Sequence, residues 1–360
     1  MKNIVKHRYL IFGLSIAILS LTIYLLCGSS ASAVENNSFN IITSPLPINL
    51  QGPPGTTLET DIRVKNGGTN IEKLKVSLMK FSAYGDEGKP SIQDRAPGDD
   101  YFDWVTFTPQ SFDAPPNVWM TIKMSINLPK TAAFGYYYAA IISRSSQPQR
   151  TNGKQSVLVG STAVLALVDA QVPGANRTAT ITSFTADKRF YEFLPATFTV
   201  KIHNSGNIHL IPSGNIFINR NGKLVTTIGI NSVAGNVLPN SNRIFSAEWN
   251  DGFPVYAQKE VDGKVVLDSK SKPVKSLQWD FSKASHLRFG HYSAHLVMAY
   301  DNGNRDVPLE ATVSFWVIPW RLIGGGLLLL ILAGAGVWSI VHKIYKKVPK
   351  KMKLRDEKIS

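Results

Sequence analysis

Short runs of alternating apolar and polar residues follow one another along most of this chain. From Phe39 onward the runs are rich in valine, isoleucine, threonine and aromatic residues, and turns containing proline, glycine or asparagine separate them. In the run TLETDIRVKN, the residues Leu58, Ile62 and Val64 share one parity, which places them on one face of a strand. No long stretch between residues 39 and 318 shows a helical apolar period. The pattern therefore predicts an all-β fold for this part of the chain.

One uninterrupted apolar stretch near the C-terminus breaks the alternation. Residues 322–341, LIGGGLLLLILAGAGVWSIV, carry no charge, and about twenty residues are needed for a helix to cross the hydrocarbon core of a bilayer. Residues 343–360 follow with eight lysines and arginines against two acidic residues. Juxtamembrane cations stay on the cytoplasmic side of a membrane. We therefore expect one transmembrane helix at residues 319–342, with the N-terminal part extracytoplasmic and the tail cytoplasmic.

The N-terminus has the composition of a secretory signal peptide. Three cationic residues precede an apolar run at residues 9–26, and small residues at 31–33 suit a cleavage site. Cys27 is the only cysteine and falls inside this segment. The exported part is therefore expected to fold without a disulfide. If cleavage fails, the same segment becomes a second membrane anchor.

The formal net charge of +14 does not indicate a nucleic-acid partner once it is divided along the chain. Three of these charges lie in the signal peptide, one is Arg321 and six lie in the tail, which leaves +4 on residues 34–320. So weak an excess gives little support to binding of a phosphate backbone. The expected partner of the basic tail is the lipid bilayer.

An internal repeat divides the exported part in two. The run ATFTVKIHNSGN matches LETDIRVKNGGTN, so that Asn204 stands where Asn66 stands, and FGHYSAHL from Phe289 matches FGYYYAAI from Phe134. The second copy is 17 residues longer between these marks, which fits an insertion around residues 255–273. This insertion contains an Asp-Gly pair typical of a tight hairpin turn.

The Phe-Gly-X-Tyr pattern opens a late strand in each copy. Tyr137 and Tyr292 are therefore expected as tyrosine-corner residues of an immunoglobulin-like sandwich. The predicted fold is all-β, with two tandem immunoglobulin-like β-sandwiches plus one C-terminal transmembrane helix. Its expected divisions are a signal peptide at 1–33, an outer sandwich at 34–172, a membrane-proximal sandwich with the insertion at 173–318, the helix at 319–342 and the basic tail at 343–360.

Catalytic motifs are scarce in the exported part. His291 and His295 have the spacing of a helical zinc pair, but in a predicted strand four residues span about 13 Å, too far for one ion. The sequence contains neither HExxH nor GxSxG, and no cysteine nucleophile is left after cleavage of the signal peptide. We expect a protein that is not an enzyme and has no cofactor.

A long loop at residues 82–117 is the predicted binding site, because loops of this length tend to be functional. It is rich in turn formers and gathers carboxylates around aromatic rings, a composition that suits a glycan or peptide. In the alternative interpretations, the carboxylates are solvated turn residues rather than a binding cluster, and Trp104 and Phe107 close one end of the sandwich. The candidate binding residues are Asp99, Asp100, Tyr101, Asp103 and Trp104, and Asp99, Asp100 and Asp103 are also weak calcium candidates.

Three motifs stand in order along the exported part: SPLPINLQGPPGTTLETDIRVKN, FGYYYAAII and NSGNIHLIPSGNIFI. Together with the signal peptide, the apolar helix and the lysine-rich tail, they resemble the bacterial WxL-interacting surface proteins. The resemblance implies an outer domain that binds peptidoglycan and a membrane-proximal domain that binds other surface or host proteins. It carries over no particular binding residue.

The leading functional hypothesis is a membrane-anchored bacterial surface protein that binds cell-wall polymer or another surface protein through its immunoglobulin-like domains. Two other classes stay open. One is an envelope-assembly accessory or sensor subunit that acts through the membrane helix, and the other is a cell-wall hydrolase.

Overall fold

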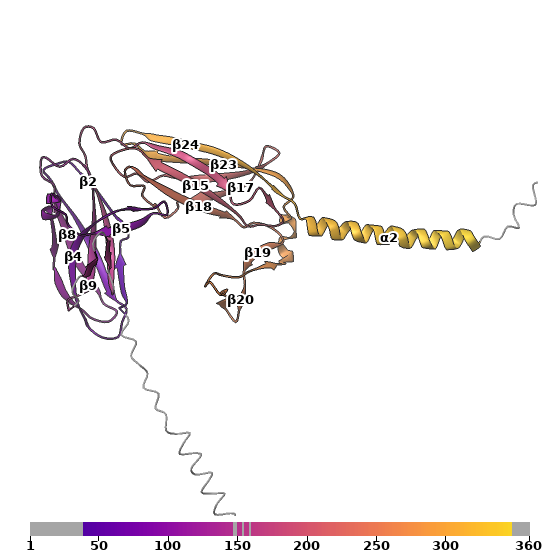
Figure 1. Cartoon of the computed structure of the whole chain (residues 1–360), viewed down its shortest axis with the longest axis horizontal. Coiled ribbons are helices and arrows are strands. Elements are labelled where there is room, and N and C mark those ends of the chain that lie inside the picture. The colour runs from indigo at the N-terminus through magenta and orange to yellow at the C-terminus, as the bar shows by residue number, and fades with distance from the viewer. Residues whose placement is uncertain (1–38, 147–149, 153–154, 158–159, 348–360) are drawn as a thin grey trace, which may run out of the picture.

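The computed structural model describes residues 39–146, 150–152, 155–157 and 160–347. The predicted signal peptide, residues 1–33, and the tail from residue 348 lie outside the described residues. The described chain is mostly β-sheet and ends in one long apolar helix (Figure 1). The prediction of strands followed by a single C-terminal helix is confirmed.

Strands β1–β12, here called the first half, form two facing sheets and a small ribbon. The sheets enclose one apolar core, which contains Ile62 and Val64 from the predicted inward parity. One sheet has the order β1 (Ile41–Ser44), β3 (Thr57–Asn66), β8 (Trp119–Asn127), β6 (Val105–Thr108). The other has the order β2 (Ile48–Gly52), β12 (Ser161–Ala170), β9 (Phe134–Arg144), β4 (Glu72–Tyr84), β5 (Lys89–Gln93), with β7 (Ser111–Ala114) also on β4. The ribbon pairs β10 (Arg150–Asn152) with β11 (Gln155–Val157), and a 3-10 helix at Asp100–Trp104 precedes β6.

The first two strands lie at the edges of different sheets. β1 pairs with β3, whereas β2 pairs in parallel with β12. Pro45 and Pro47 stand between these strands. Because proline has no N–H to donate, it suits a place where the chain leaves one edge and joins another. β1 and β2 are both edge strands, as the two prolines require.

Strands β13–β24, here called the second half, form two facing sheets with their own core. Trp249, Tyr292 and Phe315 are among its fully buried side chains. One sheet has the order β13 (Ala179–Ala186), β15 (Ala196–Asn204), β18 (Ser241–Trp249). The other has the order β14 (Phe190–Tyr191), β24 (Asp306–Val317), β23 (Gly290–Asp301), β16 (Ser213–Arg220), β17 (Lys223–Ile230).

The predicted insertion and the residues that follow it form two ribbons and a 3-10 helix beside the second half. β19 (Val255–Gln258) pairs with β22 (Lys275–Gln278), and β20 (Glu260–Val261) pairs with β21 (Lys264–Val265). Asp262 and Gly263, with φ of 53° and 71°, form the predicted hairpin turn, which requires positive φ at both central residues. The 3-10 helix Phe281–His286 then leads back to β23.

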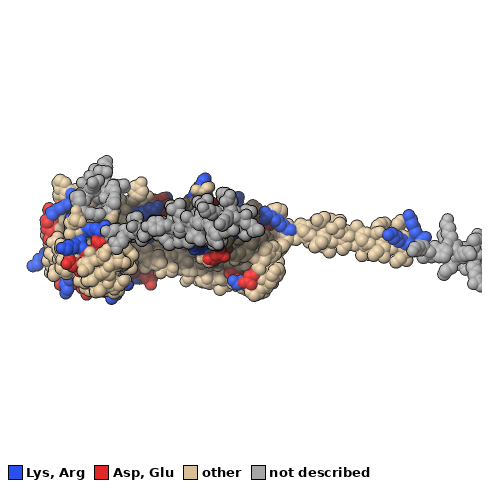
Figure 2. Space-filling model, turned by 90° about the horizontal axis from the view of Figure 1, so that it is seen from below, with Lys and Arg blue, Asp and Glu red and all other residues tan. Residues whose placement is uncertain are grey.

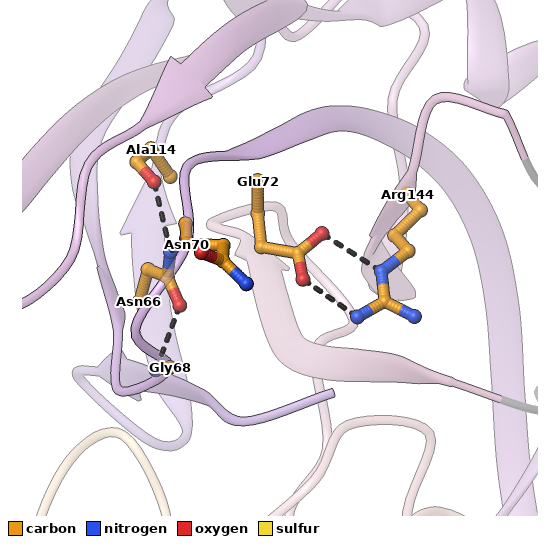
Figure 3. Close-up of polar contacts among 6 residues, drawn as sticks. All are labelled: Asn66, Gly68, Asn70, Glu72, Ala114 and Arg144. Carbon is orange, nitrogen blue, oxygen red and sulfur yellow. Dashed lines mark hydrogen bonds and ion pairs between the residues drawn. The ribbon is translucent and has the colours of Figure 1, made fainter. Parts of the chain in front are cut away.

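A buried asparagine closes the corresponding turn in each half. In the first half, Asn66 Nδ2 donates to Asn70 O (2.7 Å) and Ala114 O (2.9 Å), and its Oδ1 accepts from Gly68 N (2.8 Å) (Figure 3). In the second half, Asn204 makes the same three contacts, which reach Ile208 O (2.8 Å), Val237 O (2.9 Å) and Gly206 N (2.9 Å). The repeat that the sequence predicts is therefore present in the side-chain hydrogen bonds.

Replacing Asn204 with alanine is expected to lower the free energy of unfolding by about 2–3 kcal/mol, because buried backbone groups lose their partners. Chemical unfolding of the full chain in a mild detergent measures this change. The matched control is Asn40→Ala, since Asn40 is exposed and makes one hydrogen bond of this kind, to Gly67 O at 3.2 Å. Equal losses from the two variants would contradict the structural role of Asn204.

The C-terminal helix α2 (Trp320–Lys347) begins three residues after β24 ends at Val317. Among the described residues it is the one helix long and apolar enough to span a membrane, and none of its apolar stretch is buried against the sheets. It continues past the predicted end at residue 342 into the basic segment. Figure 1 shows α2 leaving the end of the second half that lies away from the first half.

Candidate functional site at the junction of the two halves

Ion pairs hold the carboxylates of the predicted binding loop. Asp99 accepts hydrogen bonds from Lys80 Nζ (2.7 Å) and Ala96 N (2.7 Å). Asp103 accepts two bonds from the Arg95 guanidinium (2.5 and 2.6 Å). The hydrogen bond from Arg95 lowers the pKa of Asp103 below its ordinary value. Both carboxylates therefore already have cationic partners within the protein.

The aromatic residues of the loop close one end of the first half. Trp104 packs edge-on against Tyr136 with ring centroids 4.9 Å apart, and Tyr101 lies 5.5 Å from Tyr136 and 5.7 Å from Tyr138. The Tyr138 hydroxyl donates to Tyr101 O (3.1 Å). Burial raises the pKa of Tyr101 to about 12, so its hydroxyl stays protonated at neutral pH. The structure thus shows the closing role for Trp104 that the sequence left open.

The three calcium candidates do not form a common site. Asp99 and Asp103 face different cations, and Asp100 stands between them in the 3-10 helix. Within the ranges that the structure describes, no group of three or more His, Cys, Asp and Glu side chains could hold a metal ion.

Tyr137 lies at the junction of the two halves rather than at a corner. Its ring packs edge-on against Phe81 (5.8 Å) and against His209 of the second half (5.9 Å). The backbone contact expected of a corner tyrosine is made by Tyr136, whose hydroxyl accepts from Ala133 N (2.9 Å). Because neighbouring strand residues face opposite ways, only one of the two can reach that backbone.

Tyr292 is buried in the core of the second half. It stacks on Phe315 with ring centroids 5.7 Å apart and lies 5.2 Å from Trp249. A contact of the corner type occurs instead at Tyr191, whose hydroxyl accepts from Lys188 N (3.0 Å). The sequence pattern therefore identified a junction tyrosine in the first copy and a core tyrosine in the second, and Tyr136 and Tyr191 make the backbone bonds instead.

The two halves meet on the outward face of the β12–β9–β4 sheet. This face carries a small apolar cluster separate from the main core, and Leu238 of the second half packs against it. Two polar contacts beside it involve the β4–β5 turn: Ile244 N donates to Asp86 O (2.7 Å), and Lys201 Nζ pairs with Asp86 (2.5 Å). The members of the cluster are Met79, Phe81, Ala139, Ile141 and Leu167.

A cleft of about 380 Å³ opens beside this contact, because Leu238 covers only part of the apolar face. One wall is the β12 strand, where alternate residues of one parity, from Ala163 to Leu167, are aliphatic. The opposite wall is the loop between β17 and β18, with Val233 and Leu238. Two cations, Lys89 and Arg243, also line the cleft.

Arg243 is a half-buried cation with no carboxylate partner among the described residues. Gly88 and Gly235 allow its close approach, since a Cβ atom on either would lie within 2.5 or 2.8 Å of the guanidinium. Its Nη1 donates to Asn236 O (2.6 Å), while its buried Nε makes no hydrogen bond to any described residue. Burial lowers the pKa of Arg243, yet an arginine stays charged at neutral pH. The cleft is therefore apolar along its walls and cationic at one point.

A second cavity, of about 290 Å³, lies at the same junction and is more polar. Arg177, in the segment between the halves, donates a short hydrogen bond to Asp169 of β12. His209 lines the same cavity, and its pKa is lowered to about 4 by burial and, to a smaller extent, by the charge of Arg177. Burial raises the pKa of Asp169, against the opposing effect of Arg177. This cluster holds the linker against the first half.

Sequence reasoning missed Arg243, Asp169 and Arg177 and gave His209 no role. No local motif marks these residues, because their partners come from distant strands and turns. The signal available in the sequence was that β12 carries apolar residues on both of its faces, whereas one core needs them on one face only.

No protein-family model and no curated protein matches the sequence. Solved structures that resemble the chain include the class 5 fimbriae chaperone CfaA, with 13% sequence identity and a TM-score of 0.35 over 76% of this chain and 98% of that one. The YadV chaperone (10% identity, TM-score 0.32, 76% and 99% coverage) and the CupB2 chaperone of Pseudomonas aeruginosa (12%, 0.30, 77% and 100%) are others. With TM-scores this low, these likenesses carry no argument about this chain.

Proposed function

We propose that this chain is a membrane-anchored, extracytoplasmic binding protein without catalytic activity, which holds a segment of another surface protein in the cleft between its halves. In this proposal the halves are two immunoglobulin-like sandwiches, at residues 34–172 and 173–318. The observation that carries the proposal is the Arg243 cation, half-buried in an apolar cleft with no carboxylate partner among the described residues. Arg243 has the Asn236 carbonyl and the Phe245 ring beside it but no counter-ion, and a half-buried charge without a counter-ion is costly, so a ligand that brings an anion is favoured.

Helix α2 serves as the anchor. Its central residues are uncharged and face outward along the whole apolar stretch. Figure 2 shows Lys and Arg near both ends of this apolar rod. The larger excess of cations follows the helix, and this supports a topology with the tail in the cytoplasm and both halves outside.

The shape and chemistry of the cleft suit a polypeptide segment with apolar side chains and one carboxylate. The aliphatic walls favour side chains that leave water, at about 25 cal/mol per Å² of apolar surface. The guanidinium of Arg243 has donors free for a carboxylate, and such charge-assisted bonds are stronger than neutral ones. A volume of about 380 Å³ lies within the usual size of ligand sites.

A second candidate ligand, an anionic cell-wall polymer, is favoured by a different surface. Trp119 is exposed on the β1–β3–β8–β6 sheet of the first half, with the Arg63 guanidinium 5.7 Å and the Lys65 ammonium 5.9 Å from its ring centroid. An exposed indole beside two cations suits a sugar polymer that carries acidic groups. This surface is separate from the cleft, so the two candidates can be tested independently.

Replacing Arg243 with glutamine is expected to weaken binding of an acidic apolar peptide about 10- to 100-fold, since bonds to charged groups contribute about 1.5–3 kcal/mol. The probes are two fluorescent peptides of alternating leucine and valine, one with a central aspartate and the other with asparagine. Anisotropy with the full chain in nanodiscs reports the affinity. The variant is expected to change binding of the aspartate peptide only.

Arg63→Gln is the matched control, because it removes an arginine from the β1–β3–β8–β6 sheet, outside the cleft. Ala163→Phe narrows the cleft and is expected to weaken binding of both peptides. Because this variant keeps Arg243, its effect on binding does not depend on any effect of the Arg243 change on folding. Equal affinity of wild type for the two peptides would reject the cleft site. Retention on purified cell walls that Trp119→Ala abolishes would favour the polymer, and release of soluble wall fragments would favour a hydrolase.

A further inference from the structure

Exposed aromatic residues gather at the end of the second half where α2 begins. The register pairs Gly290, the first residue of β23, with Val317, the last residue of β24, and pairs Phe190 with Trp316. These strand ends therefore lie together, three residues before the helix. The exposed apolar side chains at or next to these positions are Phe190, Leu287, Phe289, Trp316 and Trp320.

The segment that follows the insertion adds two more exposed rings at this end. Trp279 and Phe281 stack on each other with centroids 6.3 Å apart, and both contact Phe253, at 5.8 and 5.4 Å. Phe281 is 73% exposed and opens the 3-10 helix that leads into β23. Exposure of apolar rings to water is unfavourable in free energy, and such exposed apolar patches mark surfaces that contact a partner.

Hydrogen bonds fasten the 3-10 helix Phe281–His286 to this end of the second half. Phe253 N donates to His286 O (3.0 Å), and the Arg288 guanidinium donates to Asp251 O (2.9 Å) and to the Asp251 carboxylate (2.6 Å). Asp251 also bonds to His286. The rings are therefore held in place by the fold of the second half.

Cations accompany the rings, while nearby acidic groups are already engaged. Lys188 and Arg189 precede Phe190, and Lys283 lies within the 3-10 helix. Asp251 is bonded to Arg288 and His286, and Asp280 accepts from Ser282 N (3.1 Å). Aromatic rings mixed with cations are typical of a protein surface that lies in the headgroup region of a membrane.

We propose that the surface formed by Phe190, Trp279, Phe281, Phe289 and Trp316, the aromatic end surface, lies in the outer headgroup layer of the bilayer that α2 crosses. This inference rests on the proposed anchoring by α2. From Val317 to the first residue of the uncharged stretch, Leu322, is five residues, at most about 17 Å of chain. The helix thereby keeps the aromatic end surface beside the membrane, and the surface in turn fixes how the two halves are tilted.

The test is collision accessibility of nitroxide labels on the full chain, reconstituted in vesicles of phosphatidylcholine and phosphatidylglycerol. Cys27 is the only cysteine, so Cys27→Ser leaves single labelling sites at Phe281→Cys, Trp279→Cys, Val337→Cys and Val233→Cys. Val337 lies within α2, and Val233 is 83% exposed beside the cleft. Oxygen concentrates in lipid, whereas a nickel chelate stays in water.

The labels at Phe281 and Trp279 are expected to show an oxygen-to-nickel collision ratio several-fold above that at Val233, and below that at Val337. A lipid-like ratio at Val337 with a Val233-like ratio at Phe281 and Trp279 would overturn the inference and leave the anchoring intact. A water-like ratio at Val337 would overturn both. Shielding from both reagents that grows with the protein-to-lipid ratio would show a second copy on this surface and would also overturn the inference.

Discussion

Replacing Asp169 with alanine is expected to lower the free energy of unfolding by about 3 kcal/mol, because it leaves Arg177 largely buried without its counter-ion. Asp169 is 3% exposed, and Arg177 reaches it from the segment between the halves. This loss of unfolding free energy lies at the lower end of the range for broken buried ion pairs, because the Arg177 side chain is 18% exposed to water. Chemical unfolding of the full chain in a mild detergent measures the loss.

The double variant Asp169→Leu with Arg177→Leu is expected to recover most of that stability, because removing both charges removes the cost of desolvating them. Glu59→Gln is the control for an exposed pair: its partner Lys123 lies 3.1 Å away at the surface, and little change is expected. If the double variant is as unstable as the single one, the loss reflects packing rather than an unpaired charge.

Lowering the pH from 7.5 to 5 is expected to destabilise the wild-type chain by about 2 kcal/mol more than a His209→Gln variant. His209 is buried, and burial, followed by the charge of Arg177, lowers its pKa from 6.5 to about 4. The folded state therefore favours the neutral ring. Its contribution to stability is fully present above pH 6.5 and is lost as the pH falls toward 4.

The comparison between the two chains isolates this residue from other groups that titrate in the same range. Asp169, whose pKa is raised, changes stability in the opposite direction, but it is present in both chains. His209→Phe keeps a ring against Tyr137 and is a second variant without the titrating group. Equal pH dependence in wild type and both variants would show that His209 is not held neutral by the fold.

Alternation and turn chemistry were sufficient to predict most of the fold. They predicted the all-β character, the Asp262-Gly263 hairpin and the correspondence of Asn66 with Asn204, because each depends on residues close together in sequence. The apolar helix followed from its uncharged length. These features are local, and local patterns describe them well.

The candidate site could not be predicted in the same way. The carboxylates of the 82–117 loop were visible, but their pairing was not: Lys80, which binds Asp99, belongs to β4, and Arg95, which binds Asp103, lies eight residues earlier within the loop. The cleft depends on the contact between β12 and a loop some 70 residues later, which no spacing reveals. Even the choice between Tyr136 and Tyr137 depended on which face of β9 meets the upstream turn.

The pairing of β24 determines how this protein would carry a mechanical load. β24 leads almost directly into α2, and it is held lengthwise by twelve residue pairs to β23 and by two parallel pairs to β14. A partner pulled away from the cell while bound in the cleft would draw on the second half against its anchor, along the direction of β24. The ladder bonds would then be loaded in shear, so many must break together, and the chain would transmit tension to the membrane rather than unzip strand by strand.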